Sequence, residues 1–329
     1  MATGIDIPSG WQECAEKILS SNRHKVLVIG ASDSGKSTFC RFLAHFLSTA
    51  GETVGIIDAD IGQKDIGPPA CITMGMVKPN ESFDRILPMM FYFVGDVTPV
   101  RHFLPMVVGV SKLTASCPAK FKVINTTGLV HGIGRTLKGF TIEALEPDAI
   151  IGIQRTAELE PLLKGYRDRE IMRIAPSGKA VSKTPADRRK AREAAWADYF
   201  SRAVEFAIPL SKLVFQRSLI FSGRPIKGTD FLYCEESSEG VVAVTGRRVE
   251  VESRTHVVRP GFEENLLCGV AGRDGNVLGA AIVARIDFRN KRMRLLSPVP
   301  AGAIRIIQFG DIYVSADGRE LGRRNPGEF

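Results

Sequence analysis

The sequence predicts an α/β protein in which a parallel sheet carries helices on both faces and is followed by a smaller, β-rich C-terminal domain. Three observations lead to this prediction. In the first part of the chain, buried-strand patterns alternate with segments of helical periodicity, as in a parallel sheet that is covered on both faces. One of these strands runs directly into a glycine-rich loop and then a helix. From about residue 207 onward, short apolar runs are broken by Gly, Pro, Asn and Asp, which is typical of β-hairpins.

The elements of the first domain, residues 1–206, follow from the spacing of their apolar residues. Strands are indicated by continuous apolar runs, and helices by apolar residues three and four positions apart. Pro105 must kink its helix or mark a late start, because proline lacks a backbone donor. In chain order we predict a helix at 11–20, a strand at 25–30, a helix at 36–51, strands within 53–60 and 85–96, a helix at 99–116, a strand at 121–128, a short helix at 141–147, a strand at 148–154 and a charged helix within 183–206, with the β-rich domain at 207–329.

Composition and charge narrow the class of protein. The chain has 329 residues, which suggests about two domains. Its 44 basic and 36 acidic residues give a formal net charge of +8. This mild excess fits a polyanionic partner and, equally well, a basic enzyme that has no such partner. The longest apolar runs are far too short to span a bilayer, so no membrane association is predicted.

The six cysteines are scattered, with neither a CxxC pair nor a histidine at metal-ligand spacing beside them. This pattern argues against a structural zinc site and against a disulfide framework. It favours a reducing compartment, and we expect a cytoplasmic location. The first ten residues lack the charged and apolar regions of a signal peptide, which agrees with that expectation.

The most informative short motif is a phosphate-binding loop. The stretch GASDSGKST at 30–38 fits G-x-x-x-x-G-K-[ST], with a predicted strand before it and a predicted helix after it. Its glycines let successive backbone N–H groups converge on phosphate oxygens at the positive end of the helix. In such loops the lysine reaches the β- and γ-phosphates and the hydroxyl residue binds Mg²⁺. The predicted nucleotide contacts are Gly30, Ala31, Ser32, Asp33, Ser34, Gly35, Lys36, Ser37 and Thr38.

A second motif, IIDADIGQ at 56–63, places two carboxylates at the end of a buried strand. Open α/β sheets bind their ligands at that edge. A carboxylate there can hold Mg²⁺ or accept a proton from an attacking hydroxyl. The alternative interpretation is a pair of aspartates that cap the loop. The predicted metal ligands are Ser37, Asp58 and Asp60.

Longer motifs carry a resemblance to one family. They are DADIGQKDIGPPACITMG at 58–75, FYFVGDVTPVRHFLPMVVGVSKL at 91–113 and INTTGLVHGIGRTLKGFTIEALEPDAIIGIQ at 124–154. With the phosphate-binding loop, they resemble the polynucleotide 5′-hydroxyl kinases, which include the kinase subunit of pre-mRNA cleavage factor II, nucleolar pre-rRNA-processing kinases and archaeal RNA kinases. The resemblance covers nearly the whole chain from residue 25, including an arginine-rich lid at about 183–200 and the C-terminal β domain. A regulatory GTPase is not predicted, because Met293 replaces the aspartate of a guanine-reading Asn-Lys-x-Asp motif.

The resemblance implies a P-loop kinase, a short prokaryotic member of the family, that uses ATP and Mg²⁺ to phosphorylate the 5′-hydroxyl end of RNA, with DNA as an open alternative. It also implies RNA-processing proteins as further partners. By this resemblance Asp60 is the base or metal partner for the attacking hydroxyl, and the lid arginines clamp phosphates. The candidate catalytic residues are Lys36, Asp60, Arg188 and Arg192, and the candidate substrate contacts are Gln63, Arg101, Thr126, Thr127, Gly128, His131 and Arg189.

A second interpretation stays open at this point: a non-catalytic subunit that holds ATP within an RNA-processing assembly. In the family, a tryptophan that can stack on a substrate base often follows the N-T-x-G stretch. Leu129 occupies that position here. The region before the phosphate-binding loop is also short compared with that of eukaryotic members.

Overall fold

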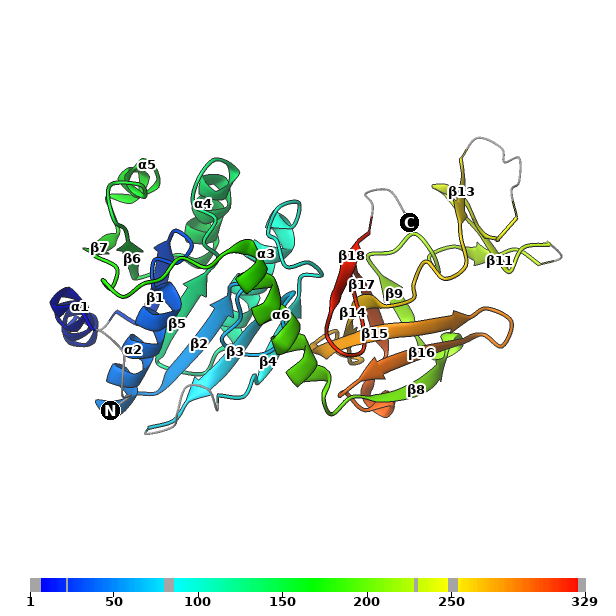
Figure 1. The fold of residues 1–329 in the computed structure, drawn as a ribbon, viewed down its shortest axis with the longest axis horizontal. Coiled ribbons are helices and arrows are strands. Elements are labelled where there is room, and N and C mark those ends of the chain that lie inside the picture. The colour runs from blue at the N-terminus through cyan, green and yellow to red at the C-terminus, as the bar shows by residue number, and fades with distance from the viewer. Residues whose placement is uncertain (1–6, 22, 80–85, 228–229, 248–253, 325–329) are drawn as a thin grey trace. The chain divides into compact units, whose positions relative to one another are not determined.

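The computed structural model describes residues 7–21, 23–79, 86–227, 230–247 and 254–324. The chain forms two compact units, residues 1–192 and 193–329. The division falls inside a long helix, α6 (Pro185–Phe200), and so comes before the boundary at 206–207 that the sequence predicts (Figure 1). Each unit has a hydrophobic core of its own.

The sheet of the first unit has the strand order β4-β3-β2-β5-β1-β6-β7. The run β2-β5-β1-β6-β7 is parallel, as the sequence predicts, whereas β3 and β4 are antiparallel to their neighbours. The strands are β1 (Lys25–Gly30), β2 (Val54–Ala59), β3 (Cys71–Val77), β4 (Met90–Phe93), β5 (Phe121–Thr126), β6 (Ala149–Ile153) and β7 (Glu170–Ile174).

The antiparallel strands β3 and β4 correct the prediction of a wholly parallel sheet. The apolar pattern does not predict β3, whereas β4 lies within the predicted range 85–96, of which residue 85 lies outside the described residues. Parallel neighbours need a crossover of a dozen or more residues, usually a helix. Only the loop 60–70 separates β2 from β3, so the chain pairs them antiparallel.

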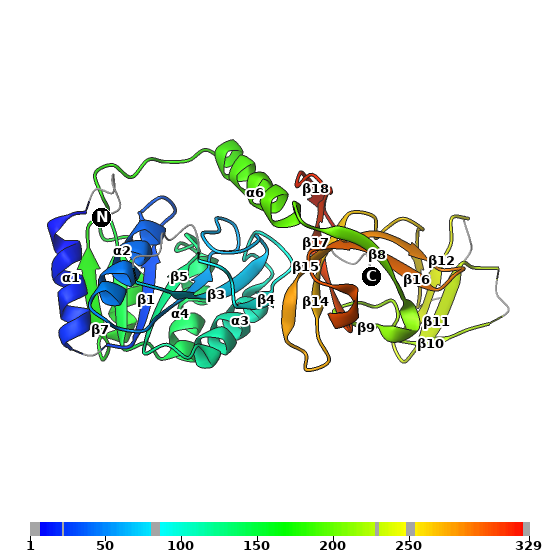
Figure 2. The same ribbon diagram turned by 90° about the horizontal axis from the view of Figure 1, so that it is seen from below.

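Helices cover both faces of this sheet, as predicted (Figure 2). Successive residues of a strand point to opposite faces. Val26 and Val28 of β1 therefore pack with α1 and α2, and Leu27 and Ile29 pack with α3, α4 and α5. The helices are α1 (Ser9–Ser20), α2 (Lys36–Thr49), α3 (Phe103–Ser116), α4 (Ile133–Leu145) and α5 (Glu160–Leu163).

Two helices begin elsewhere than the apolar pattern predicts. Helix α3 starts at Phe103, which places Pro105 in its first turn, so the late start is the correct alternative. Helix α4 starts at Ile133 rather than 141. Its glycines hide this start, because each one costs about 1 kcal/mol of helix propensity relative to alanine. Gly134 is needed for packing, since a Cβ there would lie 2.5 Å from the backbone oxygen of Leu129.

The second unit is rich in strands, as predicted. In its larger sheet, β18-β17-β14-β15 are neighbours, β16 pairs with β15 and β8, and β9 pairs with β17. A smaller sheet has the order β10-β11-β12-β13. The strands are β8 (Val204–Pro209), β9 (Val214–Gln216), β10 (Arg224–Pro225), β11 (Tyr233–Ser237), β12 (Gly240–Val244), β13 (Thr255–Val258), β14 (Leu266–Ala271), β15 (Val277–Asp287), β16 (Arg292–Ser297), β17 (Ile306–Val314) and β18 (Glu320–Arg323).

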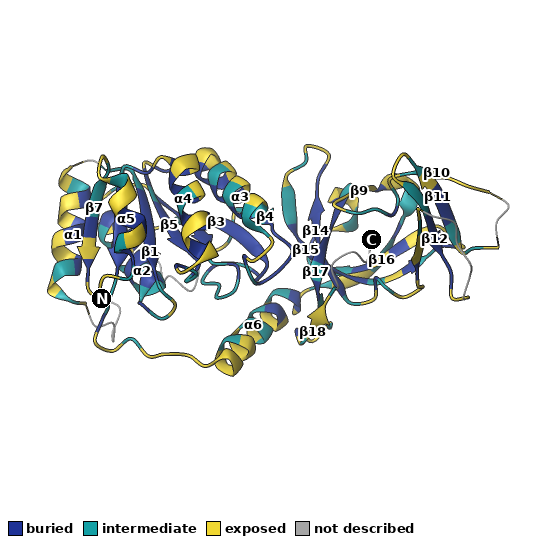
Figure 3. Cartoon of the chain, turned by 90° about the horizontal axis from the view of Figure 1, so that it is seen from above, coloured by how far each residue is buried: buried dark blue, intermediate teal, exposed yellow. Residues whose placement is uncertain are grey.

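Burial follows the layers in both units, with the central strands covered and the outer faces of the helices exposed (Figure 3). All six cysteines are free and buried. Burial is the largest cause that raises the pKa of each thiol. Across the described residues, every helix is too short or too polar to cross a membrane.

Candidate active site

A cavity of about 730 Å³ lies in the first unit, where the loops after β1, β2 and β5 converge. This is the edge at which open α/β sheets bind ligands. Two further segments complete its walls: residues 97–100, and a strap, residues 177–184, that leads into α6. The strap and the first turns of α6 contribute basic side chains, among them Lys179, Lys183 and Arg188.

The phosphate-binding loop joins β1 to α2 as the motif predicts. Gly35 is the residue before α2 and has φ of +84°, a conformation that favours glycine. At Gly30 a Cβ would lie 2.7 Å from the backbone oxygen of Ile153, so only glycine fits beside β6. The loop thereby leaves the first N–H groups of α2 directed at the cavity, which suits an anion.

Lys36 lies inside the loop. Its Nζ donates a hydrogen bond to the backbone oxygen of Ala31 at 2.8 Å. Burial lowers the pKa of Lys36, and the nearby Asp60 opposes that effect. A phosphate group in the cavity would supply the negative charge that stabilises the protonated amine.

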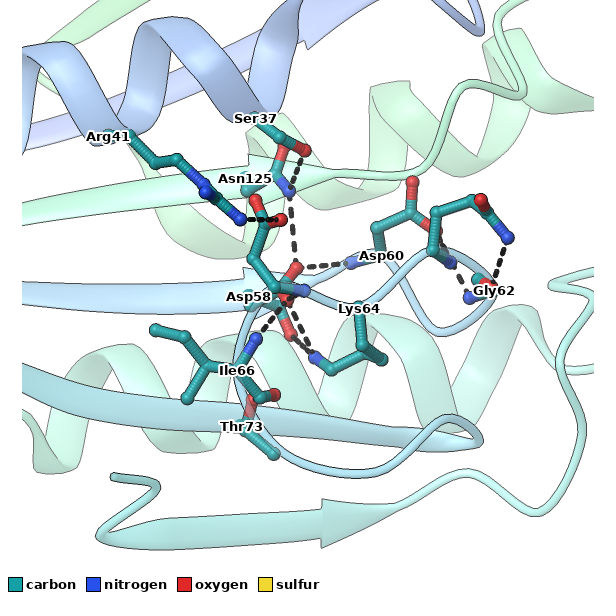
Figure 4. Close-up of polar contacts among 11 residues, drawn as sticks. Ser37, Arg41, Asp58, Asp60, Gly62, Lys64, Ile66, Thr73 and Asn125 are labelled. Atoms are coloured by element: carbon teal, nitrogen blue, oxygen red, sulfur yellow. Dashed lines mark hydrogen bonds and ion pairs between the residues drawn. The ribbon is translucent and has the colours of Figure 1, made fainter. Parts of the chain in front are cut away.

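Asp58 braces the loop that follows β2, here called the floor loop (residues 58–66). One carboxylate oxygen accepts the N–H of Asp60 at 3.1 Å, and the other accepts the N–H of Asp65 at 2.9 Å. Lys64 lies 3.1 Å from the same carboxylate, and both side chains are 1% exposed (Figure 4). Asp58 is therefore surrounded by protein donors and does not line the cavity.

Asp60, in contrast, lines the cavity. Its Oδ1 accepts the N–H groups of Gly62 at 3.1 Å and Gln63 at 3.0 Å, while Oδ2 has no hydrogen-bond donor among the described residues. Burial raises the pKa of Asp60, and Lys36 acts in the opposite direction. A carboxylate with a raised pKa and one unshared oxygen is suited to accept a proton.

Two polar residues at this site escape the sequence analysis. The Nδ2 of Asn125 donates to Ser37 Oγ and to Asp58 Oδ1, both at 3.2 Å (Figure 4). The carboxylate of Asp65 accepts a hydrogen bond from the Ser37 hydroxyl and pairs with Arg41 at 2.6 Å. A usable signal existed for Asn125, because it lies at the end of the predicted strand 121–128 beside the candidate Thr126.

Arg188 connects the phosphate-binding loop to the floor loop. Its Nη2 lies 2.5 Å from the carboxylate of Asp33, which also accepts the backbone N–H of Lys183 at 3.1 Å. The backbone oxygen of Arg188 accepts a hydrogen bond from Gln63 Nε2 at 3.2 Å. The start of α6 is thus held over both the nucleotide loop and the carboxylate loop.

The structure brings some of the predicted residues to the cavity and leaves others outside it. Thr126 donates to the backbone oxygen of Val28 at 2.8 Å, which is a bond within the sheet. Arg101, His131 and Arg189 lie on the exposed surface. The cavity is lined by Ser32, Asp33, Gly35, Lys36, Ser37, Thr38, Asp60, Gln63, Thr127, Gly128, Arg188 and Arg192, and not by Gly30, Ala31, Ser34, Asp58, Arg101, Thr126, His131 or Arg189.

Together, a phosphate-binding loop between a parallel strand and a helix, a carboxylate at the neighbouring strand's end and arginines above them define a P-loop nucleotide-binding protein. Residues 30–202 match the family model described as mRNA cleavage and polyadenylation factor CLP1 P-loop. The chain belongs to this family. A P-loop kinase family of this kind binds ATP.

Curated relatives cover nearly the whole chain. A polyribonucleotide 5′-hydroxyl-kinase of Pyrococcus furiosus is 34% identical, over 96% of this chain and 95% of its own length. One of Methanocaldococcus jannaschii is 30% identical, over 96% of this chain and 94% of its own length. A CLP1 homolog of Anopheles gambiae is 27% identical over 84% of this chain and 69% of its own length.

Solved structures share the fold at lower identity. The wild-type Clp1p–Pcf11p complex contains a chain that matches with a TM-score of 0.63 at 13% identity, over 91% of this chain and 76% of that one. A second structure of the Clp1p–Pcf11p interface, in a Gly-to-Arg point mutant that loses ATP, matches with a TM-score of 0.65 at 14% identity, over 91% and 77% of the two chains. These matches establish the fold.

Proposed function

We propose that the chain is an ATP-dependent polynucleotide 5′-hydroxyl kinase, which transfers the γ-phosphate of ATP to the 5′-hydroxyl end of RNA. The observation that carries the proposal is the single cavity that joins Lys36 of the phosphate-binding loop, Asp60 of the floor loop and Arg188 of α6. The names of the archaeal relatives, at 30–34% identity over 96% of the chain, support the same activity.

The nucleotide side of the reaction is assigned to the phosphate-binding loop and the basic side chains above it. Lys36 would contact the β- and γ-phosphates, and the N–H groups of residues 32–38 would surround them. Arg188 and Arg192, which line the cavity, would neutralise charge on the transferring group. Phosphoryl transfer depends mainly on such positioning and charge neutralisation.

The acceptor side is assigned to the floor loop. Asp60 would accept the proton of the 5′-hydroxyl as its oxygen bonds to the γ-phosphorus and the bond to the β–γ bridging oxygen breaks, which releases ADP. Gln63 would orient the acceptor; its backbone N–H donates to Asp60 and its side chain donates to the backbone oxygen of Arg188, which supports this role. Thr127 and Gly128 would border the γ-phosphate.

Mg²⁺ is the metal that these residues fit. They offer oxygen ligands, and within the part of the chain that the structure describes, the buried Oδ1 of Asn125 has no hydrogen-bond partner although its Nδ2 donates to Ser37. Ser37 would hold the ion, with Asp65 and Asn125 behind it, and Asp60 would reach it through water, which leaves its Oδ2 available for the proton. Asp58 would act through the loop, because protein donors surround it. When bound, the ion neutralises charge that develops on the phosphates.

The experiment that tests the function is transfer of label from γ-labelled ATP to oligonucleotides. RNA and DNA of matched sequence would be offered in several lengths, each with a 5′-hydroxyl end. The same oligonucleotides with a 5′-phosphate end serve as controls that cannot accept label. We expect label on the 5′-hydroxyl RNA, and the result with DNA decides the breadth of the acceptor class. Failure to label any acceptor would contradict the proposal.

One observation favours a second candidate, a non-catalytic ATP-binding subunit of an RNA-processing assembly. Leu129 lines the cavity, so this position offers an aliphatic surface and no aromatic ring for a base. Recovery of bound ATP in unhydrolysed form, together with no labelled acceptor, would support this candidate over the kinase.

A further inference from the structure

Lys138 is a buried lysine that the assigned reaction does not use. It lies on the inner side of α4 and is 2% exposed. It lines a small cavity of about 10 Å³ together with four apolar residues and three threonines: Ala59, Met106, Val110, Leu137, Thr126, Thr127 and Thr141. Within the described residues no carboxylate oxygen lies within 4.0 Å of its amine. A buried lysine without a paired carboxylate is costly, so this position calls for an explanation beyond stability.

The amine of Lys138 is linked to the active site by one residue, Thr127. Its Nζ donates a hydrogen bond to Thr127 Oγ1 at 3.1 Å. Thr127 lines both the small cavity and the large active-site cavity, so it is a residue that the two cavities share. Because Thr127 Oγ1 accepts from Lys138, its own hydrogen is free to be donated into the large cavity.

The neighbouring hydroxyls are already engaged as donors. Thr126 Oγ1 donates to the backbone oxygen of Val28 at 2.8 Å, and Thr141 Oγ1 donates to the backbone oxygen of Leu137 at 2.7 Å. Among the described residues, the Thr127 hydroxyl is therefore the polar group that connects the Lys138 amine to the active-site cavity.

We propose that Lys138 is a positioning residue for phosphoryl transfer: its ammonium orients the Thr127 hydroxyl toward the transferring phosphoryl group and gains its charge when the triphosphate binds. The inference rests on the proposed kinase function, since the ligand that supplies the negative charge is the γ-phosphate. It extends that function to a residue that touches neither substrate.

Electrostatics in the ligand-free protein agree with this role. The pKa of Lys138 is lowered to about 7, chiefly by burial and next by the charge of Lys36, while Asp60 acts in the opposite direction. These are the charged groups that act on it from α2 and the floor loop, while β2, β5 and α3 present Ala59, threonine hydroxyls and apolar side chains. An anionic phosphate beside Thr127 favours the protonated amine, so binding should take up a proton.

The first test measures that proton directly. Calorimetric titration with a non-hydrolysable ATP analogue at pH 7.5, in two buffers of different ionisation enthalpy, gives the number of protons taken up. We expect a larger uptake by the wild-type chain than by Lys138→Met, which has similar volume and no charge. Equal uptake by the two proteins would overturn the proposal. This readout does not depend on catalysis.

The second test is the pH profile of kcat with a 5′-hydroxyl RNA. Since Lys138 is charged only below its pKa, wild-type kcat should fall as pH rises through the pKa in the complex, and Lys138→Met should lack this alkaline limb. We expect a kcat about 10- to 100-fold lower for Lys138→Met, with KM for ATP changed less than threefold. Thr141→Val alters the same small cavity but removes a hydroxyl that donates to Leu137, so it should stay within twofold of wild type.

Outcomes of the second test separate a positioning role from a structural one. A lower kcat with the alkaline limb retained would overturn the proposal. If Lys138→Met does not fold, Thr127→Val and Thr127→Ser replace it: the first should reproduce the loss and the second should keep most activity. If the wild-type chain labels no acceptor, the kinase function fails, and proton uptake still decides whether Lys138 responds to the triphosphate.

Discussion

The floor loop and the strap form two walls of one cavity and are built in different ways. In the floor loop, Asp58 and Lys64 are 1% exposed and form a buried ion pair that holds the loop in place. In the strap, Val181 is 78% exposed, and Lys183 is linked to the phosphate-binding loop through Asp33. Segments with little buried apolar area open at low free-energy cost. The comparison teaches that the group assigned to proton transfer lies on the rigid wall, the floor loop, whereas Arg188 and Arg192, assigned to the phosphates, lie on α6 directly after the more exposed strap.

The largest expected effect comes from the rigid wall. Asp60→Ala should lower kcat for transfer to 5′-hydroxyl RNA by about 10³-fold, because the loss of a general base typically costs 10²–10⁴-fold. Binding of ATP, measured by calorimetry without acceptor, should change less than threefold. An Asp60→Ala variant that retains transfer would contradict the assignment.

The pKa of Asp60 adds a pH dependence to this prediction. Because burial raises that pKa, the base form is lost as pH falls through a value above the ordinary range of an aspartate. We expect an acid limb in kcat at a pH above the ordinary aspartate pKa, and this limb should disappear in the residual activity of Asp60→Ala. An acid limb at the ordinary aspartate pKa would show that Asp60 is not the titrating group.

The next largest effect is expected from removing the ion pair of Asp58 and Lys64, which holds the floor loop around Asp60. Asp58→Asn leaves Lys64 buried without its carboxylate, so the free energy of unfolding should fall by about 3–5 kcal/mol. Denaturant titration measures this loss. The double variant Asp58→Asn with Lys64→Met removes the unpaired charge and should recover part of the stability. Stability unchanged in Asp58→Asn alone would refute the view of the floor loop as the rigid wall.

On the opposite wall, Arg188→Ala should lower kcat by about 10²-fold, because it removes a cation from the transferring phosphoryl group. Stability should change by less than about 1 kcal/mol, since the side chain of Arg188 is 30% exposed and such pairs contribute little. Arg189→Ala, one position along on the exposed surface, is the control and should retain activity. A loss as large in Arg189→Ala would mean that the lid acts through its overall charge.

The smallest effect is expected where the strap meets the phosphate-binding loop. Asp33→Asn removes the charge that holds Arg188 while keeping a side chain of the same shape. We expect KM for ATP to change by at most about fivefold, because the pair is partly exposed and screened. Its effect should shrink as salt rises, and a salt-independent change of tenfold or more would show that Asp33 contacts the nucleotide itself.

The sequence predicts those parts of the site that a local backbone rule encodes. The glycines of the phosphate-binding loop indicate its backbone conformation directly, and Gly35 indeed has a positive φ. Asp60 is predictable because strand ends of open sheets meet at one edge. Lys138 is not, since a lysine on a helix normally faces solvent and only the packing of α4 on the sheet buries it. Asp65 likewise gains its position from the fold of the floor loop around Asp58.

The antiparallel edge of the sheet escapes prediction for a related reason. An apolar strand gives the same pattern whichever direction it runs, and direction is set by the length of the loop before it. The short loop 60–70 fixes β3 as antiparallel and, in doing so, folds the residues that brace Asp58. The fold class was accessible from periodicity, whereas the bracing network required the tertiary structure.

The burial of all six thiols has a practical consequence for measuring motion. A thiol reacts with alkylating probes as the thiolate, and burial keeps these six protonated and covered. A reporter cysteine introduced at the exposed Val181 would then be the one that takes up a fluorophore or spin label. Spectroscopy could follow the strap during turnover with every native cysteine left in place.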